Sequence, residues 1–426
     1  MNILFFTPVN EASAIARVSC LLTRELIASG HHITVVSTEK MTYGPARDFG
    51  AEIVSWSDES RIIHESSKAQ LVIYQIGDNY NFHRGAIEWL PRLQGIVCLH
   101  DFYVANLFNA WGSEHPDEAK ALLRYWYGEA IATSFFEMAR RSDFIEQTAD
   151  KAPLTEWIAS YALAVVSHSH WGMPRVKASC AGPVKVVPLP YNTTVDVQPA
   201  GYERHENHLA LLTVGHINAN KRVASVIRAI GSSPSLRRKV TYRLVGPISP
   251  DAVLELSDLA NALRVKLLIS GAVDDETLAQ AFAESDVVSC LRWPSLEAAS
   301  ASAIEAMLWG KPIVVTDTGF YKDIPDNLVA KIPPSNEIAE IRAALERFDK
   351  SPSERSMMGE RARQWATETY SSKNYAQSLV DLAGSLHEDR PIAVARAYFR
   401  KVLADWGSNP DRHWCDHSLG MPTYTG

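Results

Sequence analysis

The sequence predicts an α/β protein made of two domains of similar size, each built around a parallel sheet. Short apolar, β-branched runs alternate with stretches that are long enough for crossover helices, which is the pattern of a parallel sheet. This alternation is interrupted once, at 187–207, where proline and polar residues are typical of an interdomain linker. The length of 426 residues also suits two or three domains of about 100–200 residues each.

The first domain is expected to cover 1–195 and to open with a strand, a helix and a second strand. The helix is indicated by apolar residues at helical spacing in Ala14–Ala28, between short apolar runs at Ile3–Thr7 and Ile33–Ser37. Further apolar runs predict three more strands, at Leu71–Gln75, Ile96–Leu99 and Leu163–Ser167.

The second domain is expected to cover 196–375, because the strand and helix alternation restarts there. Its strands are expected at 209–214, 241–245, 265–269, 287–290, 313–316 and 329–332, with helices at 222–230, 251–263 and 275–284 between them. C-terminal helices and a tail over 376–426 should follow and pack back toward the first domain. Ligands of such folds bind beyond the carboxyl ends of the strands, so we expect a cleft between the two sheets.

Charge and motifs disfavour several classes of function. Lys plus Arg number 42 and Asp plus Glu 49, so the net charge is −7, which argues against a nucleic-acid partner. No G-x-G-x-x-G follows the first strand of either domain, so a dinucleotide-dependent oxidoreductase is disfavoured. No HExxH or similar metal-ligand pattern is present, and we expect neither a metal nor a resident cofactor.

The cysteines and the apolar runs predict a cytoplasmic protein. The five cysteines are scattered without zinc-type spacing, as suits a reducing compartment: Cys20, Cys98, Cys180, Cys290 and Cys415. The start of the chain has no basic leader, and no uncharged apolar run approaches the ~20 residues of a membrane-spanning helix. Membrane contact should therefore be peripheral at most, at the inner membrane face. Nothing in the sequence indicates the oligomeric state.

The most informative stretch runs from Leu291 to Pro312. It follows an apolar strand, so Glu297 falls at the strand-to-helix turn and Glu305 about two helical turns later. Both carboxylates could then face one ligand. The residues between them are small and leave backbone N–H groups at the helix start open to phosphate, namely Ala299, Ser300, Ala301 and Ser302. A pair of solvated helix-face carboxylates is the alternative interpretation.

This stretch resembles the retaining glycosyltransferases of family 4, whose GT-B fold has two Rossmann-like domains facing each other across a cleft. Their signature is two glutamates separated by seven residues, which Glu297 and Glu305 match. The resemblance extends to Gly310-Lys311-Pro312 and to the loop that contains Gly319. It implies that Glu297 holds hydroxyls of the donor sugar and that Glu305 holds ribose hydroxyls of the nucleotide.

A second match follows the first strand of the second domain. Gly215 opens a loop that ends in Lys221, and the resemblance implies that this ammonium meets the donor diphosphate. A lysine near a helix N-terminus is unfavourable unless an anion is present, which favours this role. The alternative interpretation is that Lys221 is an ordinary surface lysine. Many relatives have Arg just after the glycine, where this chain has His216, so Arg222 and Arg292 are candidates for the second cationic contact.

In the first domain, polar residues follow three of the expected strands. Asp78 and Asn79 look like part of the family's loops that close over sugar and acceptor, as do His100 and Asp101. In relatives the corresponding histidine approaches the transferred sugar, which implies that role for His100. The first strand-to-helix loop lacks the family's double glycine, so Asn10 or Ser13 is expected to contact ligand instead.

The resemblance implies an enzyme that moves a sugar, with retention, from a nucleoside-diphosphate sugar to an acceptor. Saccharides, including lipid-linked ones, are the expected acceptors, because similar chains build cell-surface polysaccharides. Glycosylation of a small metabolite is the alternative. Two further alternatives are a GT-B-fold sugar-nucleotide epimerase and a non-catalytic partner subunit that binds nucleotide sugar.

Overall fold

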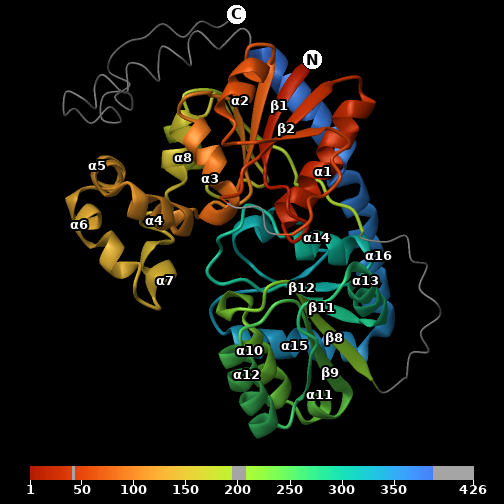
Figure 1. Ribbon diagram of the computed structural model, residues 1–426. Helices are drawn as coiled ribbons and strands as arrows, with labels where there is room; N and C mark the ends of the chain where they lie inside the picture. Colours follow the sequence, from red (N-terminus) through yellow and green to blue (C-terminus); the bar gives the residue numbers. More distant parts are fainter. Residues whose placement is uncertain (41–43, 194–207, 387–426) are drawn as a thin grey trace, which may run out of the picture. The chain divides into compact units, whose positions relative to one another are not determined.

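The computed structural model describes residues 1–40, 44–193 and 208–386, and these fall into two compact units (Figure 1). The first unit comprises residues 1–167 and 172–187 together with the described residues from 376 onward. The second comprises residues 168–171 and 188–375. The expected boundary at 195/196, residues 387–426 of the expected tail, and Cys415 lie outside the described residues.

The first unit is built on a parallel sheet with the strand order β3-β2-β1-β4-β5-β6-β7. Its strands are β1 (Asn2–Thr7), β2 (His32–Ser37), β3 (Glu52–Ser55), β4 (Leu71–Ile76), β5 (Ile96–Leu99), β6 (Ala164–Ser167) and β7 (Val184–Val186). The helices between them are α1 (Ala14–Ala28), α2 (Glu59–Ser66), α3 (Tyr80–Trp89), α4 (Ala105–Glu114), α5 (Pro116–Tyr127), α6 (Glu129–Met138), α7 (Phe144–Thr148), α8 (Thr155–Tyr161) and α9 (Met173–Ser179). Every strand pair is parallel, as the alternating pattern predicts.

Helices α4 to α8 form an insertion between β5 and β6, and Figure 1 draws α5, α6 and α7 to one side of the sheet. Aromatic side chains hold this insertion together. The ring of Phe108 makes edge contacts with Phe135 at 5.5 Å and with Trp157 at 5.0 Å between centroids. Such pairs stabilise a core beyond their burial alone. The aromatic residues of this stretch therefore include ones that pack helix against helix.

The second unit is built on a parallel sheet with the order β10-β9-β8-β11-β12-β13. Its strands are β8 (Leu209–Val214), β9 (Val240–Val245), β10 (Lys266–Ile269), β11 (Val287–Ser289), β12 (Ile313–Thr316) and β13 (Ala330–Ile332). Its helices are η1 (Ala219–Lys221), α10 (Val223–Gly231), α11 (Pro234–Lys239), α12 (Pro250–Leu263), α13 (Asp275–Glu284), α14 (Ala301–Leu308), η2 (Gly319–Asp323), α15 (Glu337–Lys350) and α16 (Pro352–Thr369). A further helical stretch runs over 372–386, and its residues from 376 onward belong to the first unit.

Both sheets reverse their strand order next to their first strand. In the first unit β1 lies between β2 and β4, and in the second β8 lies between β9 and β11. Such switch points open a crevice at the carboxyl ends of the two central strands, because the connections leave toward opposite faces. The loops after β8 and β11 are therefore the places in the second unit where a ligand is expected.

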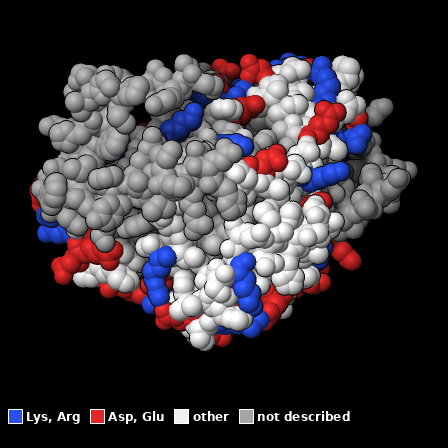
Figure 2. All heavy atoms as spheres, turned by 90° about the horizontal axis from the view of Figure 1, so that it is seen from above, with Lys and Arg blue, Asp and Glu red and all other residues white. Residues whose placement is uncertain are grey.

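The described surface agrees with the charge balance. On the face seen in Figure 2, Lys and Arg side chains of the described residues are interspersed with Asp and Glu, rather than gathered into one patch. Among the described residues, no helix combines the length and apolar character needed to span a bilayer. The cysteines within the described ranges are all buried free thiols.

Candidate functional site

A buried lysine follows the carboxyl end of β8. Lys221 ends the short helix η1, is 6% exposed, and donates from Nζ to the carbonyl oxygen of Val214 at 2.6 Å. Gly215 makes this approach possible, because a Cβ at that position would lie 3.2 Å from the same Nζ. Gly215 also has φ +92°, a conformation that other residues rarely adopt.

The surroundings of Lys221 oppose a positive charge on it. The pKa of Lys221 is lowered from 10.5 to about 7, mainly by burial and in addition by the positive charge of Arg292, while Glu297 acts in the opposite direction. A buried ammonium that lacks an adequate counter-ion is unfavourable. The site therefore favours the arrival of an anion, which would restore the charged form.

Arg292 links the loop after β11 to the start of α14. It is buried, and its guanidinium donates from Nε to Oε1 of Glu297 at 3.2 Å and from Nη2 to Oγ of Ser302 at 3.3 Å. Nη1 donates to the carbonyl oxygen of Leu291 at 2.9 Å. Although burial opposes the charge, Glu297 and neighbouring groups keep the pKa of Arg292 above its ordinary value. Lys221, Arg292, Glu297 and Ser302 thus form one group at the switch point.

The start of α14 is suited to an anion. Ser300 is the N-cap residue, but its side chain makes no capping hydrogen bond to the helix. Ala299 and Ser300 are buried, and Ala301 and Ser302 are partly buried in the first turn. Because the first N–H groups of a helix have no partner within it and carry the positive end of its dipole, they attract phosphate and carboxylate.

The second glutamate of the expected pair lies on the same helix. Glu305 is 3% exposed and accepts a hydrogen bond from the hydroxyl of Tyr191 at 3.4 Å. A solvated surface carboxylate, the alternative interpretation, does not describe this residue. Glu297, in contrast, has a side chain that is 38% exposed, with Arg292 as its ion-pair partner.

The loop after β12 packs against the loop after β11. Gly319 has φ +54°, and a Cβ there would lie 2.0 Å from Oγ of Ser295. The backbone N–H of Arg292 donates to Oγ1 of Thr316 at 3.0 Å. The hydrogen bond holds the Arg292 backbone against the end of β12. The close approach of Ser295 and the positive φ explain why a glycine is needed at position 319.

Two residues expected at the donor site have other surroundings. Arg222 donates from Nε to both carboxylate oxygens of Glu337, at 3.2 and 3.0 Å, at the start of α15. His216 is exposed in the loop after β8. The roles of both residues in donor binding remain predictions, and Arg292 is the arginine that lies beside Glu297.

In the first unit, polar side chains stabilise the loops after β4 and β5. Asp78 accepts hydrogen bonds from the backbone N–H of Leu107 at 2.8 Å and from Nδ2 of Asn106 at 2.6 Å, so it anchors the start of α4. Its own N–H donates to Oδ2 of Asp101 at 2.8 Å. Burial raises the pKa of Asp78, and the charge of Asp101 raises it further.

The other candidates on this side take part in local turns. Asn79 caps α3 by accepting from the N–H of Asn81 at 3.0 Å, and Ser13 caps α1 by accepting from the N–H of Ala16 at 3.2 Å. Asn10 accepts from the N–H of Ala12 at 2.8 Å. These bonds give each residue a structural role, and their contacts with ligand remain predictions.

His100 has a buried partner that the sequence analysis missed. Its Nε2 lies 2.6 Å from Oε1 of Gln75, and both side chains are buried. The sequence contained a signal for Gln75, because a carboxamide interrupts the otherwise apolar run of β4.

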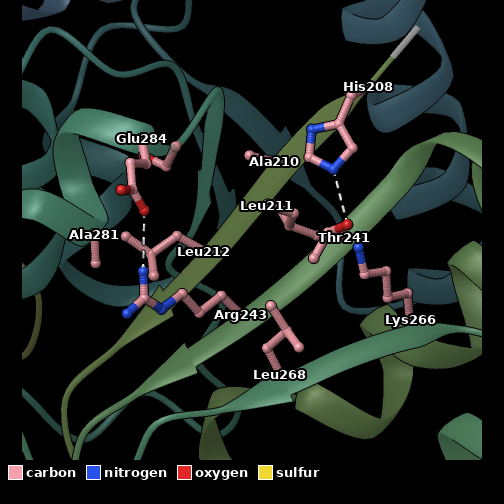
Figure 3. Close-up of a pocket in the computed structure, with 11 residues that line it drawn as sticks. His208, Ala210, Leu211, Leu212, Thr241, Arg243, Lys266, Leu268, Ala281 and Glu284 are labelled. Atoms are coloured by element: carbon pink, nitrogen blue, oxygen red, sulfur yellow. Dashed lines mark hydrogen bonds and ion pairs between the residues drawn. The ribbon is translucent and has the colours of Figure 1, made fainter. Parts of the chain in front are cut away.

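A cavity of about 510 Å³ lies elsewhere in the second unit (Figure 3). It opens on the face of β8, β9 and β10, and none of the expected site residues lines it. Figure 3 shows Arg243 paired with Glu284 on α13, at 3.2 Å, and His208 bonded to Thr241 at 2.8 Å. His208, Thr241 and Lys266 mark the amino ends of the strands, so this cavity is distinct from the group around Lys221. No cluster of three or more His, Cys, Asp or Glu side chains suited to a metal ion occurs among the described residues.

Comparison with known proteins identifies the second unit. Residues 196–365 match the family model of the glycosyl transferases group 1. The chain carries a glycosyl transferases group 1 domain. This domain contains every residue of the Lys221 group, and both glutamates of the expected pair.

A curated relative extends the family match. The chain is 27% identical over 271 residues to the MMP alpha-(1→4)-mannosyltransferase of Mycolicibacterium hassiacum. That match covers 61% of this chain and 58% of the relative, so the chain spans little more than half the length of this relative.

Solved structures of other proteins share the fold of this chain. Sucrose-phosphate synthase of Thermosynechococcus elongatus is 15% identical, with a TM-score of 0.65 over 91% of this chain and 99% of that one. Anabaena HepE in complex with UDP-glucose is 14% identical, with a TM-score of 0.61 over 90% and 100%. The lipopolysaccharide-biosynthesis glycosyltransferase WaaG is 16% identical, with a TM-score of 0.58 over 89% and 99%. These likenesses and the two parallel sheets confirm the predicted GT-B fold class.

Proposed function

We propose that the protein transfers a sugar from a nucleoside-diphosphate sugar to an acceptor hydroxyl, with retention of configuration. The observation that carries this proposal is the buried Lys221 at the switch point of a group 1 glycosyltransferase domain. Its ammonium is destabilised without an anion, and the uncapped start of α14 is in the same unit. A diphosphate would supply the missing negative charge.

The chemistry follows from where charge develops. When the bond between the anomeric carbon and the diphosphate oxygen breaks, the leaving group gains negative charge and the sugar becomes cationic. Lys221, Arg292 and the N–H groups of α14 would stabilise the leaving diphosphate, and preorganised groups of this kind usually supply the largest catalytic effect. Glu297 would hold sugar hydroxyls, and Glu305 would hold the ribose.

Retention is proposed to occur by attack from the face that the diphosphate leaves. The acceptor oxygen forms its bond to the anomeric carbon on that face, and the departing phosphate oxygen takes the acceptor's proton. This route requires no protein base. We assign no resident cofactor and no metal to it.

The acceptor is proposed to be a saccharide, with lipid-linked saccharides included, in the synthesis of cell-surface polysaccharide. A curated relative is named as an alpha-(1→4)-mannosyltransferase, and a 1→4 linkage to a sugar hydroxyl supports a saccharide acceptor. The neighbour HepE was solved in complex with UDP-glucose, which supports a nucleotide sugar as donor. The donor base and sugar are left to the experiment.

The test is a calorimetric screen of the purified chain against UDP, GDP, ADP and their common sugars. Lys221→Met and Glu305→Ala should each weaken binding of the selected nucleotide at least about tenfold, since each removes a group that contacts charge or hydroxyls in a buried site. Lys239→Met is the matched control, because Lys239 lies in the same unit but pairs with Asp349 at 2.9 Å.

Transfer is then measured with the selected donor and a panel of saccharide acceptors, and the product's anomeric configuration is read by NMR. A retained configuration supports the proposal, whereas an inverted product overturns the mechanism. A folded protein that binds no nucleotide would contradict the donor site. Binding without transfer to any acceptor would favour the non-catalytic partner.

A further inference from the structure

Gln75 is a buried carboxamide in β4, a strand whose other side chains are apolar or aromatic. Every residue of β4 is buried, and Gln75 is 0% exposed within it. Burying an amide costs free energy unless its polar atoms are hydrogen-bonded. Among the described residues, Nε2 of Gln75 has no hydrogen-bond partner, so the amide is only half satisfied. Packing alone does not explain a glutamine at this position.

The satisfied half of the amide is directed at His100. Oε1 of Gln75 lies 2.6 Å from Nε2 of His100, in a contact that is buried on both sides. The backbone holds the histidine there, because the N–H of His100 donates to the carbonyl oxygen of Ile76 at 2.9 Å, just past the pairing of β4 with β5. The ring and the amide are therefore both positioned by the sheet rather than by a flexible loop.

This contact determines the state of the imidazole ring. An amide oxygen only accepts hydrogen bonds, so Nε2 of His100 must carry a proton to donate to it. In a neutral imidazole the other nitrogen, Nδ1, is then the acceptor. Nδ1 in this tautomer can accept a hydrogen bond from a hydroxyl group. In the opposite tautomer Nδ1 carries the proton and would donate to the hydroxyl oxygen instead.

We propose that Gln75 is a positioning residue that holds His100 as the Nε2–H tautomer, so that Nδ1 accepts from a sugar hydroxyl. The part that concerns the sugar rests on the proposed function, because it requires a glycosyl ligand. The tautomer itself does not. The buried amide nitrogen without a hydrogen-bond partner makes this arrangement unfavourable for stability. A hydrocarbon side chain of similar length would avoid that penalty, but it would no longer fix the tautomer of His100.

The first experiment reads the tautomer directly in the full chain. Nitrogen and carbon NMR of histidine-labelled protein distinguishes the two neutral tautomers, and His100→Asn identifies the His100 signals among the 14 histidines. The wild-type protein should show Nε2 protonated and Nδ1 unprotonated above the pKa of the ring. An Nδ1–H signal for His100 in the wild-type protein would overturn the proposal without any variant.

Two variants separate positioning from packing. Gln75→Met keeps the length of the side chain but removes the acceptor, so the His100 signals should shift toward a mixture of tautomers. Thr7→Val is the matched control, because it removes a buried polar contact at the end of β1, Oγ1 of Thr7 to Oγ of Ser19 at 2.7 Å. The control should leave the His100 signals unchanged. Unchanged His100 signals in a folded Gln75→Met protein would also overturn the proposal.

Kinetics tests the consequence for transfer. Gln75→Met should lower kcat about tenfold or more while the donor KM changes less than about twofold, as expected when only the orientation of a reacting group is disturbed. An unchanged kcat would remove the link to the sugar. If the wild-type protein transfers no sugar, the proposed function fails, and the tautomer measurement still decides the role of Gln75.

Discussion

At the scale of single residues, Lys221 is held in surroundings that favour its neutral form. Its pKa of about 7 results from burial and from the charge of Arg292 nearby. A ligand that brings two or three negative charges would reverse this balance and raise the pKa again. Ligand binding and proton binding should therefore be coupled at this one amine.

The coupling predicts proton uptake when a nucleoside diphosphate binds. Near pH 8, at about one unit above the pKa, most Lys221 is neutral in the free protein, and a bound diphosphate should draw close to one proton onto it. Calorimetric titrations in two buffers with different ionisation enthalpies measure that number. Lys221→Met should bring it close to zero, whereas Lys239→Met should not. Equal heats in both buffers for the wild-type protein would contradict the coupling.

The same depressed pKa predicts how stability depends on pH. Between about 7 and 10.5 the unfolded chain holds a proton on Lys221 that the folded chain lacks, so the residue's contribution to stability rises with pH across this window. Lys221→Met should therefore stabilise the ligand-free protein below pH 7, and this gain should shrink as the pH rises toward 10.5. Urea unfolding at several pH values measures it. A gain that is constant with pH would contradict the prediction.

The positions of site residues in the fold were predictable where they depend on nearby sequence. Lys221 lies in the loop after β8, Glu297 lies in the loop after β11 and Glu305 lies in the helix that follows this loop, so the strand pattern alone brings them toward one end of the sheet. The surroundings of Arg222 depend on Glu337, which is 115 positions away. No local pattern indicates such a pairing. Gln75 could have been found, because a glutamine inside an apolar strand calls for a partner.

At the scale of elements, the buried apolar strands were the most predictable feature, and the short, exposed strands were the least predictable. Buried parallel strands consist of continuous apolar runs, so β1, β5 and β8 begin and end within a residue of their expected bounds. Two strands were not predicted: β3, where three of the four residues are exposed, and β7, which has three residues and none fully buried. Neither strand has the apolar run on which the prediction depends.

The start of α4 depends on one carboxyl group outside the helix. Asp78 accepts from Leu107 N–H and from Asn106, and Val104, the N-cap residue, provides no side-chain bond. Asp78→Ala should therefore destabilise the protein by about 1–2 kcal/mol, the usual cost of losing a helix cap. Urea unfolding measures the change.

A control variant and a neighbouring charge limit the size of the loss of stability expected for Asp78→Ala. Asp58→Ala removes an exposed cap from α2, whose Oδ1 accepts from the N–H of Arg61 at 3.1 Å, and should cost less than Asp78→Ala. Burial and, after it, the charge of Asp101 raise the pKa of Asp78, so the loss of this buried carboxyl beside Asp101 offsets part of the cost. A stability equal to that of the wild-type protein would show that Asp78 does not anchor α4.

At the scale of the whole molecule, the two units share an architecture but differ in what their switch points offer. The second unit presents Lys221, Arg292 and the start of α14, all of which attract an anion. The first presents the carboxyl groups of Asp78 and Asp101 near His100, and a carboxyl group offers no positive charge to an anion. The charge distribution therefore supports the proposal that the diphosphate binds in the second unit.

This asymmetry predicts where a nucleotide protects the backbone from hydrogen exchange. A nucleoside diphosphate at about 100 times its Kd adds about 2.7 kcal/mol to the stability of the unit that binds it. Exchange measured by mass spectrometry should slow most in peptides that cover 215–222 and 290–305, because those loops hold the cationic groups and the helix start. Peptides of β1, β2 and β3 should change much less. The Lys221→Met protein should lose this protection from exchange at the same nucleotide concentration. Protection confined to the first unit would show that the diphosphate has been assigned to the wrong sheet.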